Sequence, residues 1–242
     1  MTILLKTFIH TACCAALIAS GTAQAHYLWI ESGDSGARLY YGEPDALLKE
    51  KSPGKLDNIK SPKAFVQDTP SGKPGAVTIS RAAEYFAIAN NKGTPAILAV
   101  EESLEVRDLT KHGLGFAKSN YYARYGQAAT DSSASPLVLD IHGSGPNKLA
   151  VVYRGQPLKD AKLEVIAPNT WMQEHKTDAQ GAVHINTPWR GQYVVHVLHI
   201  DQAPGEFSGK KYDSLRNHLT YTFTKADGSD PGPAVPPKHE MD

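Results

Sequence analysis

Histidine is the residue type whose chemistry stands out in this chain, and one histidine has a special position. His26 follows Ala23-Gln24-Ala25, which has the A-x-A form of a signal-peptide cleavage site. Cleavage after Ala25 would make His26 the first residue, with a free α-amine beside its imidazole. These two nitrogens can chelate one metal ion, whereas a histidine inside the chain offers its ring alone. The alternative is that histidine follows the cleavage site by chance and is merely an exposed terminus.

Imidazole and carboxylate are the only strong metal ligands of the mature chain, because both cysteines, Cys13 and Cys14, lie in the leader. The pattern has no His-x-His or His-x-x-x-His pair, so a metal site would have to be assembled from distant segments. Five histidines have weaker claims as ligands. His112 lies in a loop, His142 ends a predicted strand, and three are read as solvent-facing or turn residues: His175, His184 and His239.

Three further histidines join His26 as candidate ligands for a divalent transition metal. On the strand predicted at Tyr193–Ile200, His196 and His199 point to opposite faces, so they cannot share one ion without a bulge. We prefer His199, because the strand ends there and a carboxylate follows at the rim. His196 is more typical of a hydrogen-bonded packing residue. His218 lies between a charged loop and a strand, also at a rim.

Composition narrows the classes of function. Loss of the leader removes Lys6, which leaves 25 − 1 = 24 basic against 25 acidic residues and argues against nucleic acid as a partner. No segment after the leader approaches the roughly 18 apolar residues of a membrane span. Motifs for a nucleophile elbow, a zinc peptidase, a P-loop or a dinucleotide site are absent, so we do not expect an enzyme. The leader predicts a periplasmic or secreted protein.

The elements that would position these residues are predicted to be β-strands. Short alternating or apolar runs recur between Gly, Pro, Asn and Asp, which is typical of an all-β protein. We expect strands at Tyr27–Glu31, Arg38–Tyr41, Ala64–Gln67, Ala76–Ser80, Tyr85–Ala89, Ile97–Glu101, Leu137–His142, Lys148–Tyr153, Lys162–Ala167, Val183–Asn186, Gln192–Ile200 and Leu219–Thr224. Leu114–Gly126 is expected to be a helix or an ordered loop, and Asp45–Leu56 another short helix.

The chain is predicted to divide into four parts. Residues 1–25 form the signal peptide, 26–130 an N-terminal β domain of uncertain topology and 136–225 a C-terminal β-sandwich. The small, polar stretch Ala128–Pro136 marks the boundary between the two domains. Residues 226–242, rich in Pro, Gly and charge, are expected to form a disordered tail.

The C-terminal half resembles the prealbumin-like, carboxypeptidase-regulatory type of sandwich. The resemblance rests on three phrases, Gly155–Val165 (GQPLKDAKLEV), Thr177–Val183 (TDAQGAV) and Gly191–Val195 (GQYVV). It implies a fold and not a function.

The whole mature chain to about Lys225 resembles a bacterial family of periplasmic nickel and cobalt uptake components. The opening His26–Glu31 (HYLWIE) and the closing phrases Gly209–Asp213 and Leu219–Phe223 carry this resemblance, although Asn217-His218 stands where an aromatic residue is expected. It implies a protein that binds nickel or cobalt and assists a membrane transporter. Imidazole and amine ligands alone would favour copper. A binding or adhesion module without metal, and a copper protein with an N-terminal histidine brace, remain the alternatives.

Overall fold

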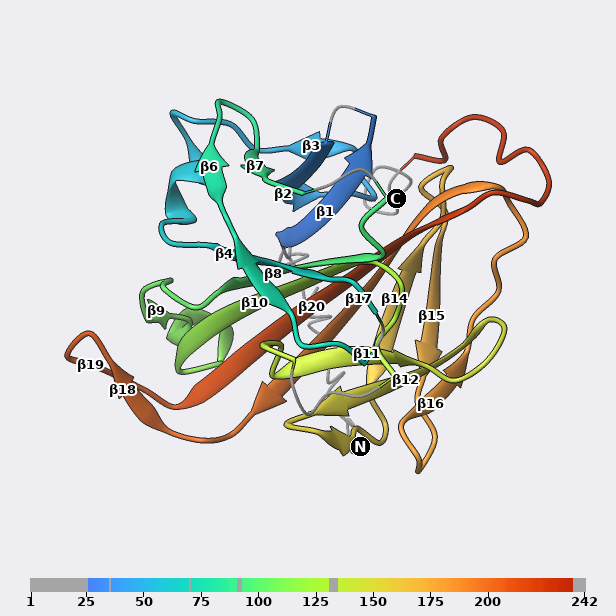
Figure 1. Ribbon diagram of the computed structural model, residues 1–242. Helices are drawn as coiled ribbons and strands as arrows, with labels where there is room; N and C mark the ends of the chain where they lie inside the picture. Colours follow the sequence, from blue (N-terminus) through green and yellow to red (C-terminus); the bar gives the residue numbers. More distant parts are fainter. Residues whose placement is uncertain (1–25, 35, 70, 91–92, 131–134, 237–242) are drawn as a thin grey trace, which may run out of the picture.

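The chain folds almost entirely into β-strands, which confirms the predicted all-β, sandwich-type fold. The computed structural model describes residues 26–236 apart from 35, 70, 91–92 and 131–134 (Figure 1). Within these residues the helical segments are two short 3-10 turns, η1 (Lys55–Asn58) and η2 (Thr110–His112). The predicted signal peptide, residues 1–25, lies outside the described residues.

Three sheets form three layers (Figure 1). The N-terminal layer contains β1 (Tyr27–Gly33), β2 (Gly36–Glu43), β3 (Leu48–Lys49), β6 (Ile79–Arg81) and β7 (Phe86–Ile88), in the order β1-β2-β7-β6 with β3 beside β2. The C-terminal layer contains β11 (Leu139–Gly143), β12 (Lys148–Tyr153), β13 (Gln156–Pro157) and β16 (Ala182–His184). A separate hairpin of β18 (Gly205–Phe207) and β19 (Lys210–Tyr212) projects at one side of the molecule.

The central sheet lies between these two layers and has nine strands. Its order is β15-β14-β17-β20-β10-β8-β4-β5, and β9 pairs with β10. The strands are β4 (Lys63–Gln67), β5 (Gly75–Val77), β8 (Ala96–Glu101), β9 (Arg107–Asp108), β10 (Phe116–Gly126), β14 (Lys162–Ile166), β15 (Met172–Lys176), β17 (Gly191–Asp201) and β20 (Ser214–Lys225). Strands from both sides of the predicted boundary at 128–136 therefore share one sheet, joined by the parallel pair β10–β20.

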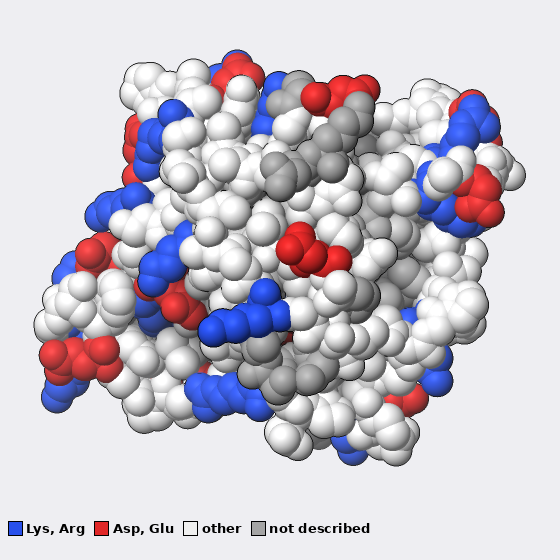
Figure 2. Space-filling view, viewed as in Figure 1, with Lys and Arg blue, Asp and Glu red and all other residues white. Residues whose placement is uncertain are grey.

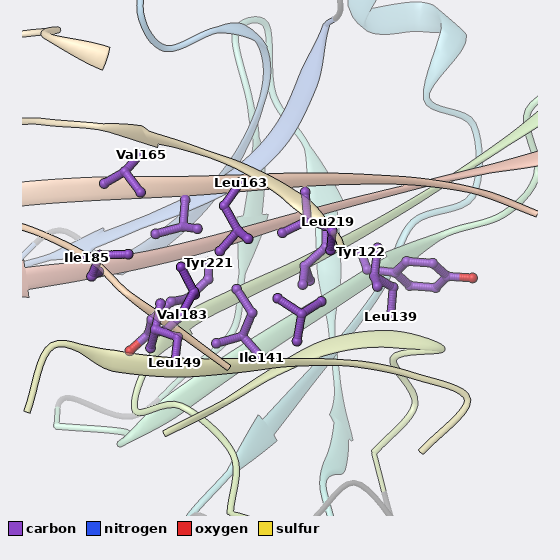
Figure 3. Packing of buried hydrophobic residues seen from close by; sticks show 14 of the residues in the cluster. Tyr122, Leu139, Ile141, Leu149, Leu163, Val165, Val183, Ile185, Leu219 and Tyr221 are labelled. Carbon is purple, nitrogen blue, oxygen red and sulfur yellow. The ribbon is translucent and has the colours of Figure 1, made fainter. Parts of the chain in front are cut away.

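The central sheet is buried on both faces, so consecutive residues of one strand enter different cores. In β8, Ile97 and Ala99 pack with the N-terminal layer, while Leu98 and Val100 pack toward the C-terminal layer. Figure 3 shows the second of these cores, where Leu163 and Leu219 of the central sheet lie across from Ile141 of the C-terminal layer.

The prediction of a helix or ordered loop at Leu114–Gly126 is wrong, because most of this stretch is the eleven-residue strand β10. Tyr121 and Ala123 enter one core and Tyr122 enters the other. A strand covered on both faces lacks the alternation of polar and apolar residues by which strands are recognised. The short helix expected at Asp45–Leu56 is also wrong in extent: this stretch holds turns, β3 and the start of η1.

A buried ion pair ties the central sheet to the C-terminal layer. Arg124 of β10 donates to both carboxylate oxygens of Asp140 of β11, at 2.8 and 2.6 Å, and to Gln67 of β4 at 3.0 Å. Neither charged side chain has exposed surface. The two-point contact fixes the geometry of the pair and satisfies groups that would be costly to bury alone.

Part of the predicted tail contacts the loop after β14. Asn169 donates its side-chain amide to the carbonyl of Pro231, and Val235 N–H donates to the carbonyl of Asn169 at 2.7 Å. Residues 237–242 lie outside the described residues.

No helical segment in the described part of the chain has the length and apolar character needed to cross a membrane. On the face shown in Figure 2, basic and acidic side chains are interspersed over a largely uncharged surface.

Candidate functional site

His26 lies immediately before β1, and its ring is held between two carboxylates. Its Nε2 is 2.6 Å from Glu50 Oε1, and its Nδ1 is 3.4 Å from Glu43 Oε1. The β1–β2 hairpin explains one contact: Tyr27 pairs with Gly42, and the same register carried one residue further sets His26 opposite Glu43. Glu50 follows β3, and its backbone N–H donates to the carbonyl of Tyr41 at 2.8 Å.

The contacts of the His26 ring leave room for a proton or a metal ion at Nδ1. A neutral imidazole has one N–H, and the shorter contact assigns it to Nε2, which then donates to Glu50. Nδ1 would then turn a lone pair toward Glu43, an oxygen acceptor 3.4 Å away. A proton or a metal ion between Nδ1 and Glu43 is needed to make this contact favourable.

The His26 ring is accessible from one side, with a side-chain exposure of 13%. It lines a pocket of about 560 Å³, which we call the His26 pocket; the other lining residues are Tyr41, Lys55, Asn58, Lys60, Leu104, Glu105 and Arg107. Lys55 Nζ lies 3.2 Å from Glu50 Oε1 and 3.4 Å from His26 Nε2. Burial raises the pKa of Glu50, but hydrogen bonds from His26 and Lys55 outweigh it and leave the pKa below its ordinary value.

His196 and His218 form a second cluster on the strands β17 and β20. His196 Nε2 is 3.4 Å from His218 Nδ1, and His196 Nδ1 is 3.1 Å from Glu164 Oε2 on β14. The Tyr27 hydroxyl donates to the same Glu164 oxygen at 3.1 Å. One arrangement of protons satisfies these hydrogen bonds with both imidazoles neutral: His218 donates to His196, and His196 donates to ionised Glu164.

The electrostatics of this cluster follow from its burial. Burial lowers the pKa of His196, partly offset by Glu164, and lowers the pKa of His218 well below its ordinary value. The hydrogen bond from His196 lowers the pKa of Glu164 to about 2. Both imidazoles are therefore neutral near pH 7, and this cluster is a hydrogen-bonded packing network between β1 and the central sheet.

Two tyrosines separate the clusters. Tyr41 has its ring centroid 5.1 Å from that of His26, and Tyr121 stacks on His218 at 4.7 Å with an interplanar angle of 13°. Tyr41 and Tyr121 meet edge to face at 6.0 Å. The structure thus brings His196 and His218 together but does not bring either to His26.

His199, the preferred partner in the sequence, lies on the other face of the central sheet. Its ring packs on Tyr153 of the C-terminal layer, with centroids 4.3 Å apart, and burial lowers its pKa. It is therefore separated from both clusters by the sheet itself. Among the remaining histidines, His184 Nδ1 contacts the carbonyl of Asn147 and His175 contacts Gln173, while His239 lies outside the described residues.

The sequence pattern did not identify the carboxylates that contact these rings, Glu43, Glu50 and Glu164. A signal for Glu43 was available, because the two predicted strands at Tyr27–Glu31 and Arg38–Tyr41 flank a glycine-rich turn. In the hairpin that forms at that turn, paired residues have numbers that add up to 69, as in the pair Tyr27 and Gly42. The same register places His26 opposite Glu43. Glu50 and Glu164 reach their partners through longer connections that a local pattern does not encode.

In the described residues, no group of three or more His, Cys, Asp or Glu side chains is arranged to hold a metal ion. The α-amine of a processed His26 is a donor of another kind, present only after cleavage.

A family model described as a domain of unknown function (DUF4198) matches residues 139–201, about a quarter of the chain. These residues run from β11 to the end of β17, so the match relates all four strands of the C-terminal layer and part of the central sheet to an uncharacterised domain family. No curated protein and no solved structure matches the chain.

Proposed function

We propose that this chain is a periplasmic protein that binds a divalent transition-metal ion, nickel or cobalt, at its processed N-terminus and passes it to a membrane uptake system. The observation that carries the proposal is the 3.4 Å approach of His26 Nδ1 to Glu43 Oε1, an arrangement that a proton or a metal ion between the two atoms would stabilise. The preference for nickel or cobalt comes from the family resemblance of the opening and closing phrases.

The donor set suits such an ion. Nδ1 is the ring nitrogen close enough to the α-amine of its own residue to close a small chelate ring, and it is also the nitrogen that faces Glu43. Amine, imidazole and carboxylate are together acceptable ligands for late first-row divalent ions. Glu50 would then accept the hydrogen bond from the other ring nitrogen, Nε2, without contacting the metal. A metal-bound imidazole usually donates its other N–H to a carboxylate or carbonyl in this way.

Three protein donors leave further coordination positions of the ion unfilled, and the ring of His26 lines the His26 pocket. An ion held in this way is accessible for transfer to a partner, as a carrier requires. In the described residues the neighbours of His26 are carboxylates, an amine and a tyrosine ring. This favours a carrier over a copper histidine brace, which uses a second imidazole.

The test is calorimetric titration of Ni²⁺ into protein that begins at His26 and into protein with one extra glycine ahead of it. We expect the extension to weaken binding at least about tenfold, because it converts the α-amine into an amide that is a poor ligand. Parallel titrations with Co²⁺ and Cu²⁺ rank the metals. Equal, tight binding by the extended form would rule out the terminal chelate.

A matched pair of variants tests the carboxylate. Glu43→Gln removes the charge at Nδ1, and Glu31→Gln removes an ion-paired carboxylate of β1 whose partner is Lys49 at 2.9 Å. We expect only Glu43→Gln to weaken Ni²⁺ binding, by roughly tenfold. Thermal unfolding of both variants, recorded without metal, separates this effect from a loss of stability.

A further inference from the structure

The lining of the His26 pocket is mostly of opposite charge to the two carboxylates that contact the nitrogens of His26. Three of its lining side chains, Lys55, Lys60 and Arg107, are cationic, and one, Glu105, is anionic. Glu43 and Glu50, by contrast, approach the two nitrogens of His26 from within the N-terminal layer. The pocket lining therefore carries an excess of positive charge, while the two carboxylates that contact His26 are not among its lining residues.

Two of the three cations have no ion-pair partner among the residues that the structure describes. Lys55 pairs with Glu50 at 3.2 Å, and Glu105 is directed to Lys210 at 3.7 Å. Lys60 and Arg107 are exposed and form no ion pair with any residue that the structure describes. They come from the segment after η1 and from β9, so they flank the pocket from two separate elements.

This arrangement favours an anionic metal complex over a bare metal ion. A divalent cation approaching through the pocket is repelled by the unpaired Lys60 and Arg107. An organic polycarboxylate that already holds the metal removes this conflict, because its remaining carboxylates attract the same cations. Arginine in particular matches a carboxylate with two parallel N–H donors.

We propose that the His26 pocket binds a small organic polycarboxylate together with its metal ion, with Lys60 and Arg107 holding the carboxylates and His26 and Glu43 contacting the metal. The proposal rests on the proposed function for the metal and adds the chemical class of its carrier. The pocket volume of about 560 Å³ lies within the range of about 300–1,000 Å³ typical of small-molecule sites. Tyr41 and Leu104 supply an apolar wall for the carbon skeleton.

Equilibrium dialysis with radiolabelled citrate tests the proposal on the full mature protein. We expect citrate to be retained one to one with Ni²⁺, and at least tenfold less tightly when Ni²⁺ is omitted. The double variant Lys60→Gln/Arg107→Gln is expected to lose citrate retention by tenfold or more while binding Ni²⁺ alone at least as tightly as the parent protein, because it lacks the two charges that repel the free ion. The matched control Lys73→Gln/Lys148→Gln removes two exposed lysines that do not line the pocket and is expected to behave as the parent.

The outcomes distinguish this proposal from the one on which it rests. Retention of Ni²⁺ with all citrate left free would overturn the polycarboxylate proposal and leave the terminal metal site standing. Equal citrate retention by the parent and the double variant would also overturn it. Failure of Ni²⁺ to bind the processed protein in the absence of citrate, together with equal citrate retention with and without Ni²⁺, would instead reject the metal function.

Discussion

The two histidine clusters differ in what their contacts demand. At His196 and His218, neutral rings and one ionised Glu164 satisfy every hydrogen bond in a single direction. At His26, carboxylates face both ring nitrogens, so a proton or metal ion has to complete the arrangement. The first cluster is buried and the second opens into a pocket. A binding site is therefore identified less well by the number of its imidazoles than by two other properties. These are its accessibility to solvent and whether its hydrogen-bond donors and acceptors match one another.

Acid is expected to cause the largest loss in the free energy of unfolding, and it acts through the buried cluster of His196, His218 and Glu164. The folded pKa of Glu164 is about 2 against an ordinary 4.5, so its contribution is complete above about pH 4.5 and is lost as the pH falls toward 2. The pKa values of His196 and His218 are also lowered, so the unfolded chain takes up their protons first and stability declines as the pH falls below 6.5. Glu164 alone accounts for at most about 3 kcal/mol. Urea unfolding between pH 7 and pH 3 measures the decline.

A His218→Phe variant tests how much of this pH dependence comes from the buried histidines. Phenylalanine keeps the stacking on Tyr121 but removes one buried group that resists protonation. We expect a shallower loss of stability between pH 6.5 and pH 5 than in the parent. A stability that does not change between pH 7 and pH 4 in the parent would contradict the assignment of neutral, buried rings.

The next effect in size is that of His196→Ala. The change leaves a cavity and removes the donor to Glu164, a carboxylate whose side chain is only 22% exposed. We expect the free energy of unfolding to fall by about 2 kcal/mol or more, with Ni²⁺ affinity of the folded protein unchanged. Chemical denaturation and calorimetry measure the two quantities, and His184→Ala, at an exposed position, is the control. A tenfold loss of Ni²⁺ affinity without loss of stability would place His196 in the metal site.

The smallest change in free energy is expected for Glu50→Gln at the His26 site, where it concerns Ni²⁺ binding. The amide oxygen still accepts from Nε2, but without its charge it makes the ring a weaker ligand. We expect a loss of Ni²⁺ affinity of about tenfold, or about 1.4 kcal/mol, and little change in stability. Glu84→Gln, which removes a surface ion pair with Lys51, is the matched control. Indistinguishable affinities for the two variants would show that Glu50 does not support the metal.

The sequence was informative about strands and much less so about which strands are neighbours. The alternation in Tyr193–Ile200 correctly set His196 and His199 on opposite faces, because side-chain direction in a strand is a local property. The preference for His199 rested on its position at a strand end, but its face is toward the C-terminal layer. Which layer covers a face depends on long-range pairing, and no local pattern records it. The prediction of a helix or loop at β10 was wrong for a similar reason. The strand packs on both faces, and the residues that cover it come from strands distant in the sequence.

The parallel pairing of β10 with β20 has a consequence for the timing of folding. β20 contains residues 214–225, near the end of the chain, yet it is flanked by β17 and β10 in the middle of the central sheet. During synthesis, β10 and β17 have no strand to join them until residues 214–225 have been made. Contacts of such large sequence separation form slowly. In a chain predicted to carry an export leader, such a delay would leave more time for translocation in the unfolded state.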